Sequence, residues 1–187
     1  MKKFFAFVLD IAKMVVISLA IIIPVRYFLV QPFYVKGASM EPNFQEHEYL
    51  MVDEITYRFK EPKRGDVIVF RYPKDPQEYY IKRVIGLPGD TIAIKDGAVY
   101  LTDAEGLTQK INEDYLPSYT STIALSEEPV KLSADEYYVL GDNRNGSKDS
   151  RSFGAVKKSF IIGRVFFRGW PVNRVGMVAT GSYELSK

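Results

Sequence analysis

The sequence contains no cysteine and only one histidine, His47. The lack of cysteine excludes disulfide bonds, a thiolate nucleophile and a cysteine-based zinc site. A single histidine leaves one candidate for the base of a histidine-dependent catalytic triad. The net charge is only +2, and the basic residues are scattered along the chain, so the sequence does not predict a nucleic-acid partner.

Long amphipathic helix patterns are also missing after the first 30 residues or so, whereas residues that favour strands are abundant. The chain has 13 tyrosines and 10 prolines, and hydrophobic residues make up 47% of its 187 residues. This composition can fill a core and favours strands and turns over helices. The length suits one compact domain and a short additional segment.

One long hydrophobic run is present, at the N-terminus. Residues 14–25 carry no charge, and the apolar stretch reaches Val30 if Arg26 extends its side chain to the membrane interface. Three lysines precede this run, which predicts a cytoplasmic N-terminus. We therefore expect a retained membrane anchor over residues 1–31 and an extracytoplasmic domain over residues 32–187. A cleaved secretory signal peptide is the alternative, but no convincing Ala-x-Ala site follows the run.

The rest of the chain alternates apolar runs of strand length with turn signals. The turn at Leu87–Asp90 separates two such runs, and residues from about 103 to 133 form a polar, loop-rich insertion. The pattern predicts a mainly β fold with an antiparallel sheet. The predicted strands lie within Arg64–Pro73, Tyr79–Ile94, Ala98–Thr102, Glu136–Asn143 and Phe160–Pro171.

Ser39 is a candidate nucleophile that follows the hydrophobic run closely, and it needs a base. His47 is eight residues away, but the Gly-x-Ser-x-Gly elbow is incomplete, and His47 is interpreted as a solvated surface residue. Lys82 is the other candidate, because burial lowers the pKa of an amine. Strand alternation places Lys82 on one face with Tyr80 and Val84. Taken alone, this strand pattern favours a lysine that faces solvent.

The segment Gly141–Gly154 is rich in Gly, Asn, Asp and Ser and follows a predicted strand. An ordinary Asx-rich turn would have this composition. Asp149 and Arg151 have a spacing that allows an ion pair, and Ser147 could accept a hydrogen bond from a lysine amine. A metal site on Asp142 and Asp149 would lack the density of carboxylates that a calcium loop has, so we predict no metal and no cofactor.

Four blocks in this order resemble the bacterial type I signal peptidases, which are membrane-bound serine–lysine proteases. Each block alone is weak, but four in sequence over residues 37–154 form a specific pattern. The blocks are Gly37-Ala38-Ser39-Met40-x-Pro42, Arg64-Gly65-Asp66-Val67-Ile68-Val69-Phe70, Tyr80-Ile81-Lys82-Arg83-Val84-Ile85-Gly86-Leu87-Pro88-Gly89-Asp90 and Gly141-Asp142-Asn143-Arg144-x-x-Ser147-x-Asp149-Ser150-Arg151-x-x-Gly154.

The resemblance implies roles for individual residues. Ser39 would be the acylating nucleophile and Lys82 its general base, with Ser147 orienting the lysine amine. The pair Asp149 and Arg151 would fix the loop around it. The backbone N–H of Ser39 would contribute to the oxyanion hole. Some relatives carry a serine or threonine two residues before the nucleophile, where this chain has Gly37 and so lacks that hydroxyl donor.

The resemblance also implies a substrate and a location. Family members cut exported preproteins after small residues in an Ala-x-Ala pattern, at the outer face of the cell membrane, and we expect a monomer in the lipid bilayer. Two alternatives stay open: a self-cleaving serine–lysine protease of the repressor type, and a non-catalytic anchored β module that binds exported proteins. The pocket positions implied by the resemblance are Phe33, Val35, Val69, Tyr80 and Ile81, although each would also suit plain core packing.

Overall fold

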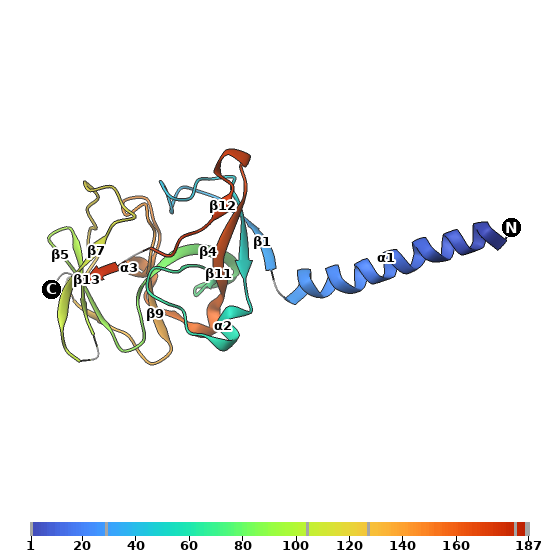
Figure 1. Ribbon diagram of the computed structural model, residues 1–187. Helices are drawn as coiled ribbons and strands as arrows, with labels where there is room; N and C mark the ends of the chain where they lie inside the picture. Colours follow the sequence, from blue (N-terminus) through green and yellow to red (C-terminus); the bar gives the residue numbers. More distant parts are fainter. Residues whose placement is uncertain (1, 29, 104, 127, 182, 186–187) are drawn as a thin grey trace.

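A long N-terminal helix extends away from a domain built of strands (Figure 1). The computed structural model describes residues 2–28, 30–103, 105–126, 128–181 and 183–185. Helix α1 spans Lys2–Phe28, and its stretch Lys3–Ile22 is long and apolar enough to cross a membrane, with none of that stretch buried against the domain. The helix thus covers residues 14–25 of the predicted hydrophobic run and begins well before them, whereas Val30, the far end of that run, already belongs to a strand. Residues 1 and 29 of the predicted anchor lie outside the described residues.

The larger of two antiparallel sheets contains the first four strands of the domain together with four later strands. Its strand order is β1-β2-β11-β3-β4-β9-β10, and β12 pairs with β11. The predicted strands before residue 90 and after residue 135 are found here. The bounds are β1 (Val30–Tyr34), β2 (Tyr49–Asp53), β3 (Val67–Tyr72), β4 (Asp75–Gly86), β9 (Glu136–Leu140), β10 (Val156–Lys157), β11 (Ile161–Trp170) and β12 (Gly176–Met177).

The second sheet has five strands and lies at the end of the domain opposite α1 (Figure 1). It corrects the expectation that residues 103–133 form only a loop-rich insertion, because two of its strands lie within that range. β7 pairs with β6 along its length and so continues the sheet. The strands, in the order β13-β7-β6-β5-β8, are β13 (Tyr183–Leu185), β7 (Thr108–Glu113), β6 (Ala98–Thr102), β5 (Thr91–Lys95) and β8 (Val130–Lys131).

Turn chemistry explains how these strands reverse direction. The predicted turn at Leu87–Asp90 is closed by the Asp90 carboxylate, which accepts a hydrogen bond from the Leu87 N–H at 2.7 Å. β5 and β6 are joined by Asp96 and Gly97, both with positive φ, of 50° and 74°. An Asp-Gly pair with these angles is the two-residue turn that matches the twist of a β-hairpin. The two short α-helices of the domain are α2 (Thr56–Phe59) and α3 (Ser150–Phe153), and 3-10 turns form at η1 (Lys158–Phe160) and η2 (Val172–Arg174).

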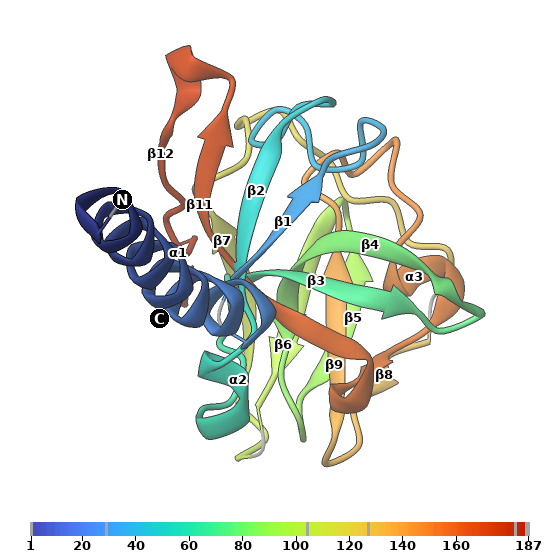
Figure 2. The same cartoon turned by 90° about the vertical axis from the view of Figure 1, so that its right-hand side faces the viewer.

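The larger sheet curls, so that strands far apart in its order face each other. Three strands separate β1 from β4 in the sheet, yet the rings of Phe33 on β1 and Tyr79 on β4 have centroids only 5.7 Å apart. Figure 2 shows β1 and β4 converging on one side of the domain. The connection between β1 and β2 is anchored in the core by Met40 and Phe44, which are 1% and 2% exposed. The curl therefore forms a groove, and this connection lies at its end.

Candidate active site

The first candidate residue lies on the nucleophile loop, which we define as residues 37–46 between β1 and β2. Backbone bonds from Val35 N to Glu48 O (2.9 Å) and from His47 N to Val35 O (3.0 Å) close the base of this loop. Gly37 has a φ of +79°, a conformation that residues with a Cβ rarely adopt. The carbonyl of Ser39 accepts a bond from Asn143 N at 3.1 Å. The loop is thus held at its base and at Ser39 itself.

The structure brings Ser39 and Lys82 together. The Nζ of Lys82 lies 2.8 Å from the Oγ of Ser39 and 2.7 Å from the carbonyl oxygen of Ile81. Lys82 is 3% exposed, which contradicts the interpretation as a solvent-facing strand residue. Burial lowers its pKa from 10.5 to about 8, although the negative charges of Asp149 and Asp142 partly oppose this shift. An amine with this pKa is neutral in about one molecule in ten at pH 7, far more often than an ordinary lysine, and in its neutral form it can accept a proton.

The segment after β9 supports this pair from one side. Asp149 is completely buried and forms a bidentate ion pair with Arg151, with distances of 2.8 Å from Oδ1 to Nε and 2.8 Å from Oδ2 to Nη2. Its carboxylate also accepts a bond from Gly141 N at 3.1 Å and caps α3. The segment therefore has one fixed shape, as the spacing of Asp149 and Arg151 predicts.

Ser147 does not make the hydrogen bond to the Lys82 amine that the resemblance implies. Its Oγ is buried but makes no hydrogen bond within the described part of the chain, while the Lys82 amine bonds to Ser39 and to Ile81 O instead. Ser147 nevertheless lies close to the nucleophile: a Cβ built on Gly141 would come within 2.1 Å of the Ser147 Oγ and 2.4 Å of the Ser39 carbonyl oxygen. Ser147 and the backbone of Ser39 thus border the same small space beside Gly141.

A groove of about 680 Å³ contains Ser39 and Lys82. Its walls come from the end of β1 on one side and from β3 and β4 on the other, as the curl of the sheet requires. Charged side chains, among them Glu78 and Lys148, lie at its rim and are exposed. The five pocket positions implied by the resemblance all line this groove: Phe33, Val35, Val69, Tyr80 and Ile81.

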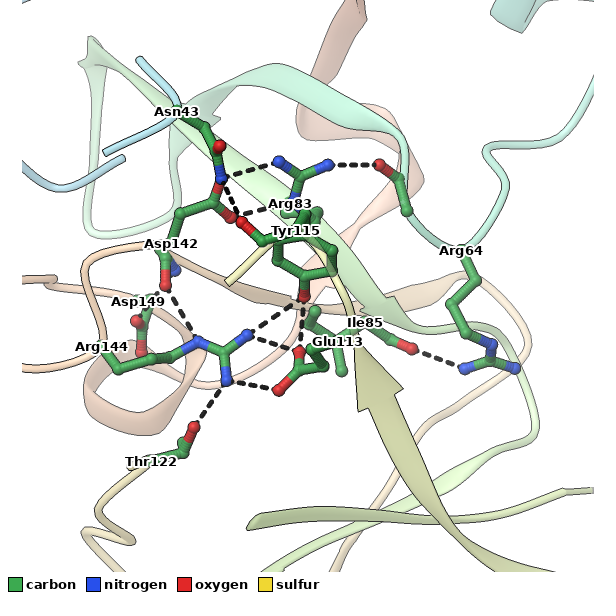
Figure 3. A network of polar contacts seen from close by, with 12 residues as sticks. Asn43, Arg64, Arg83, Ile85, Glu113, Tyr115, Thr122, Asp142, Arg144 and Asp149 are labelled. Atoms are coloured by element: carbon green, nitrogen blue, oxygen red, sulfur yellow. Dashed lines mark hydrogen bonds and ion pairs between the residues drawn. The ribbon is translucent and has the colours of Figure 1, made fainter. Parts of the chain in front are cut away.

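A buried polar network behind the groove was not expected from the sequence (Figure 3). Arg83 follows Lys82 on β4 and donates to the Asp142 carboxylate from both Nε (2.9 Å) and Nη2 (2.6 Å). Arg144 donates to Glu113 of β7 at 2.7 Å, from Nη1 to Oε2. These pairs join residues 59 and 31 positions apart, so no local pattern could have indicated them. The network ties the second sheet to the segment that supports the catalytic candidates.

Two alternatives lose support at this stage. His47 is exposed and accepts or shares a hydrogen bond with the Tyr34 hydroxyl, and it is not among the residues that line the groove. Asp142 and Asp149 are each paired with an arginine rather than facing each other around a shared site. Among the described residues, no group of three or more potential metal ligands is present.

Comparison with known proteins shows which family the chain belongs to. A family model described as "Signal peptidase, peptidase S26" matches residues 8–170. A probable signal peptidase I-2 from Synechocystis sp. is 37% identical over 175 residues, which cover 91% of this chain and 77% of the relative. Signal peptidase I from Bacillus amyloliquefaciens is 35% identical over 178 residues, covering 90% and 91%.

Among solved structures, a signal peptidase I from Enterococcus faecalis V583 has 32% identity and a TM-score of 0.46, covering 57% of this chain and 97% of that one. The family match extends from within α1 to the end of β11 and includes the candidate dyad. The relatives are covered over most of their length as well. The chain therefore belongs to the signal peptidase family, peptidase S26, a family of serine endopeptidases.

Proposed function

We propose that this chain is a membrane-bound signal peptidase I that removes signal peptides from exported preproteins with a Ser39–Lys82 dyad. One observation carries the proposal: a buried lysine amine with a pKa of about 8 lies 2.8 Å from a serine hydroxyl inside a groove. A neutral amine at this distance can take the proton of the hydroxyl as the oxygen attacks.

Acylation proceeds by attack of the Ser39 Oγ on the carbonyl carbon of the scissile bond, while the Lys82 amine takes the hydroxyl proton. The tetrahedral intermediate carries its negative charge on the former carbonyl oxygen, which the Ser39 N–H stabilises. Collapse of this intermediate breaks the C–N bond, and the Lys82 ammonium gives its proton to the departing amine. The products of this step are the free N-terminus of the mature protein and an ester on Ser39.

Deacylation uses the same amine a second time. Water attacks the ester carbonyl, and Lys82 takes one of its protons. When the second intermediate collapses, Lys82 returns the proton to the Ser39 oxygen, and the signal peptide leaves as a carboxylic acid. The lysine thus ends each cycle neutral, which its burial favours.

Ser147 supports the amine in this proposal. A neutral amine has two N–H bonds and one lone pair, and the lone pair must face the Ser39 hydroxyl. With one N–H directed to the Ile81 carbonyl, the buried and unpartnered Oγ of Ser147 is the acceptor for the other, once the side chains turn slightly. Asp149 and Arg151 hold the segment that carries Ser147.

Selectivity for small residues comes from the walls of the groove. Apolar side chains, among them Phe33, Val69 and Ile81, line the groove beside the dyad, and we expect them to leave only shallow pockets. An extended substrate would bond through its main chain to the edges of the flanking strands, and alanine side chains would enter the pockets. This arrangement predicts the Ala-x-Ala preference and disfavours large side chains at both pocket positions.

The membrane position follows from α1. Its apolar stretch has no packing partner in the described domain, and the lysines at its start predict a cytoplasmic N-terminus. The catalytic domain would then lie on the outer face, as a monomer. β1 begins only two positions after α1 ends at Phe28, and this spacing in the sequence would keep the groove near the bilayer surface, where a signal peptide ends.

The test uses the full chain in detergent with a purified preprotein and mass spectrometry of the product ends. Wild type should cut after an Ala-x-Ala sequence, whereas Ser39→Ala and Lys82→Met should give no product while remaining folded. Lys157→Met removes an exposed lysine on β10 and should retain full activity. Processing by Ser39→Ala would instead favour a non-catalytic module that binds exported proteins beside a contaminating protease.

A further inference from the structure

A buried charged triad lies next to the nucleophile loop. Glu48, directly before β2, is 1% exposed. Its Oε2 lies 2.8 Å from Nε of Arg168 on β11, and its Oε1 lies 2.8 Å from Nη1 of Arg174 in η2. The arginine side chains are 15% and 24% exposed, so all three charges are largely removed from water.

Stability alone is a poor reason for such a triad. Withdrawing three charges from water costs free energy that their mutual attraction barely offsets, and apolar residues of similar volume often stabilise a protein as well or better. Buried ion pairs are better attested as devices that specify one geometry. The question is therefore which geometry these arginines specify.

Both arginines also bond to one backbone atom of the nucleophile loop. Nη2 of Arg168 donates to the carbonyl oxygen of Asn43 at 2.6 Å, and Nη2 of Arg174 donates to the same oxygen at 2.9 Å. Arg168 lies over the ring of Phe44 as well, with Cζ 5.2 Å from the ring centroid. The triad thus holds the loop four residues after Ser39 by charge-assisted bonds, which are among the stronger hydrogen bonds in proteins.

The side chain of Asn43 continues this connection towards the lysine strand. Its Nδ2 lies 2.9 Å from Oδ2 of Asp142 and 2.9 Å from the carbonyl oxygen of Tyr115 (Figure 3). Asp142 is also the ion-pair partner of Arg83, which follows Lys82 directly on β4. Asn43 therefore links the strand that carries the base with the loop that carries the nucleophile.

We infer that Asn43, Arg168 and Arg174 are positioning residues that set the Ser39 hydroxyl at its 2.8 Å distance from the Lys82 amine. The inference rests on the proposed function, since it assigns these residues to the same dyad. None of them touches the reacting atoms. They act by fixing the loop at Asn43, four residues after Ser39, whereas Asn143 of the segment 141–149 holds the loop at the Ser39 carbonyl oxygen.

The experiment measures kcat, KM and the pH midpoint of kcat for the full chain in detergent, with a peptide spanning a preprotein cleavage site. Arg174→Met removes one bond to the Asn43 carbonyl and one ion pair of Glu48, and it keeps an unbranched side chain that can still pack. We expect kcat on its high-pH plateau to fall about tenfold, because small displacements of reacting groups have large effects on rate. KM should stay within about twofold and the pH midpoint should not move, because the groove walls and the burial of Lys82 are untouched.

Two further variants complete the design. Asn43→Ala removes the side-chain bonds to Asp142 and Tyr115 without leaving a buried charge unpaired. It should also lower kcat about tenfold, and it tests the positioning role if Arg174→Met does not fold. Arg164→Met is the matched control: Arg164 lies on β11 like Arg168, but its ion pair is with Asp66 at 4.0 Å. This control should leave kcat unchanged.

The outcomes separate the two claims. If Asn43 has only a structural role, Asn43→Ala should have a lower melting temperature but the wild-type kcat per folded molecule. That result would overturn the positioning role. A shifted pH midpoint also overturns it, because the residues would then act through the charge of Lys82. If Ser39→Ala or Lys82→Met retains cleavage, the proposed function itself fails; if both are inactive, an unchanged kcat in Asn43→Ala overturns only the positioning role.

Discussion

Replacing Lys82 by methionine should abolish cleavage and at the same time make the folded domain more stable. Burial lowers the pKa of this lysine from 10.5 to about 8, so its charged form is less favourable in the folded state than in the unfolded chain. At pH 7 the amine is charged in most molecules of both states. The difference in pKa then corresponds to a destabilisation of about 3 kcal/mol, which methionine, uncharged and similar in length, does not carry.

The sign of the pH dependence follows from the same shift. Above pH 10.5 the lysine is neutral in both states, and ionisation has no effect on stability. As the pH falls from 10.5 towards about 8, the unfolded chain takes up the proton and the folded domain does not, so wild type loses stability in this window. The advantage of Lys82→Met should therefore be largest, about 3 kcal/mol, at pH 7 and should shrink towards pH 10.5.

Urea unfolding of the full chain in detergent measures this difference, with the fluorescence of Trp170, the single tryptophan, as the signal. Comparing the two proteins at each pH cancels the titration of all other groups. A stability difference that is constant between pH 7 and pH 10.5 would refute the reasoning, because it would show that the lysine has no depressed pKa. A variant less stable than wild type at pH 7 would do the same.

Three further predictions concern the same site. The value of kcat/KM should rise about tenfold per pH unit below 8 and level off above it, as the catalytic amine loses its proton; a profile flat from pH 6 to 9, with chemistry limiting, contradicts this. Gly141→Ala should lower both activity and stability, because the new Cβ would lie 2.4 Å from the carbonyl oxygen of Ser39; Gly176→Ala, with no atom within 4 Å of its Cβ, is the control for thermal melts and rates. Asp149→Asn should lower the free energy of unfolding by about 3 kcal/mol and also reduce kcat, because it leaves Arg151 without its buried charge partner; retention of both would show that the pair has no such role.

Local patterns in the sequence were sufficient for the α1 segment and for six of the thirteen described strands, among them the two longest. Apolar runs between turn residues correspond to β3, β4, β5, β6, β9 and β11, because alternation and turn chemistry act over a few neighbouring residues. The pair Asp149 and Arg151 was predictable for the same reason, since two positions separate its members. The strand β7 was not: its polar residues gain their place by pairing with β6, a condition that its own composition does not reveal.

The identity of Ser39 and Lys82 as candidates came from the sequence, through four blocks that resemble one family. Their environment came only from the tertiary structure. Strand alternation could not show that both faces of β4 are buried from Lys82 to Gly86, whereas the folded chain leaves Lys82 3% exposed and so lowers its pKa. The burial of Lys82 depends on the curl of the larger sheet, which brings β1 close to β4 although three strands lie between them in the sheet order.

The residues that hold the nucleophile loop show most clearly what the sequence alone does not reveal. Glu48 precedes its partners Arg168 and Arg174 by more than a hundred residues, and each of the three reads in the sequence as an ordinary surface charge. Long-range pairs of this kind depend on which strands the topology makes neighbours, here β2 and β11. The sequence alone determined the type of chemistry and the local elements, and the tertiary structure decided how the reacting groups are buried and held, because burial and long-range contacts belong to the folded chain as a whole.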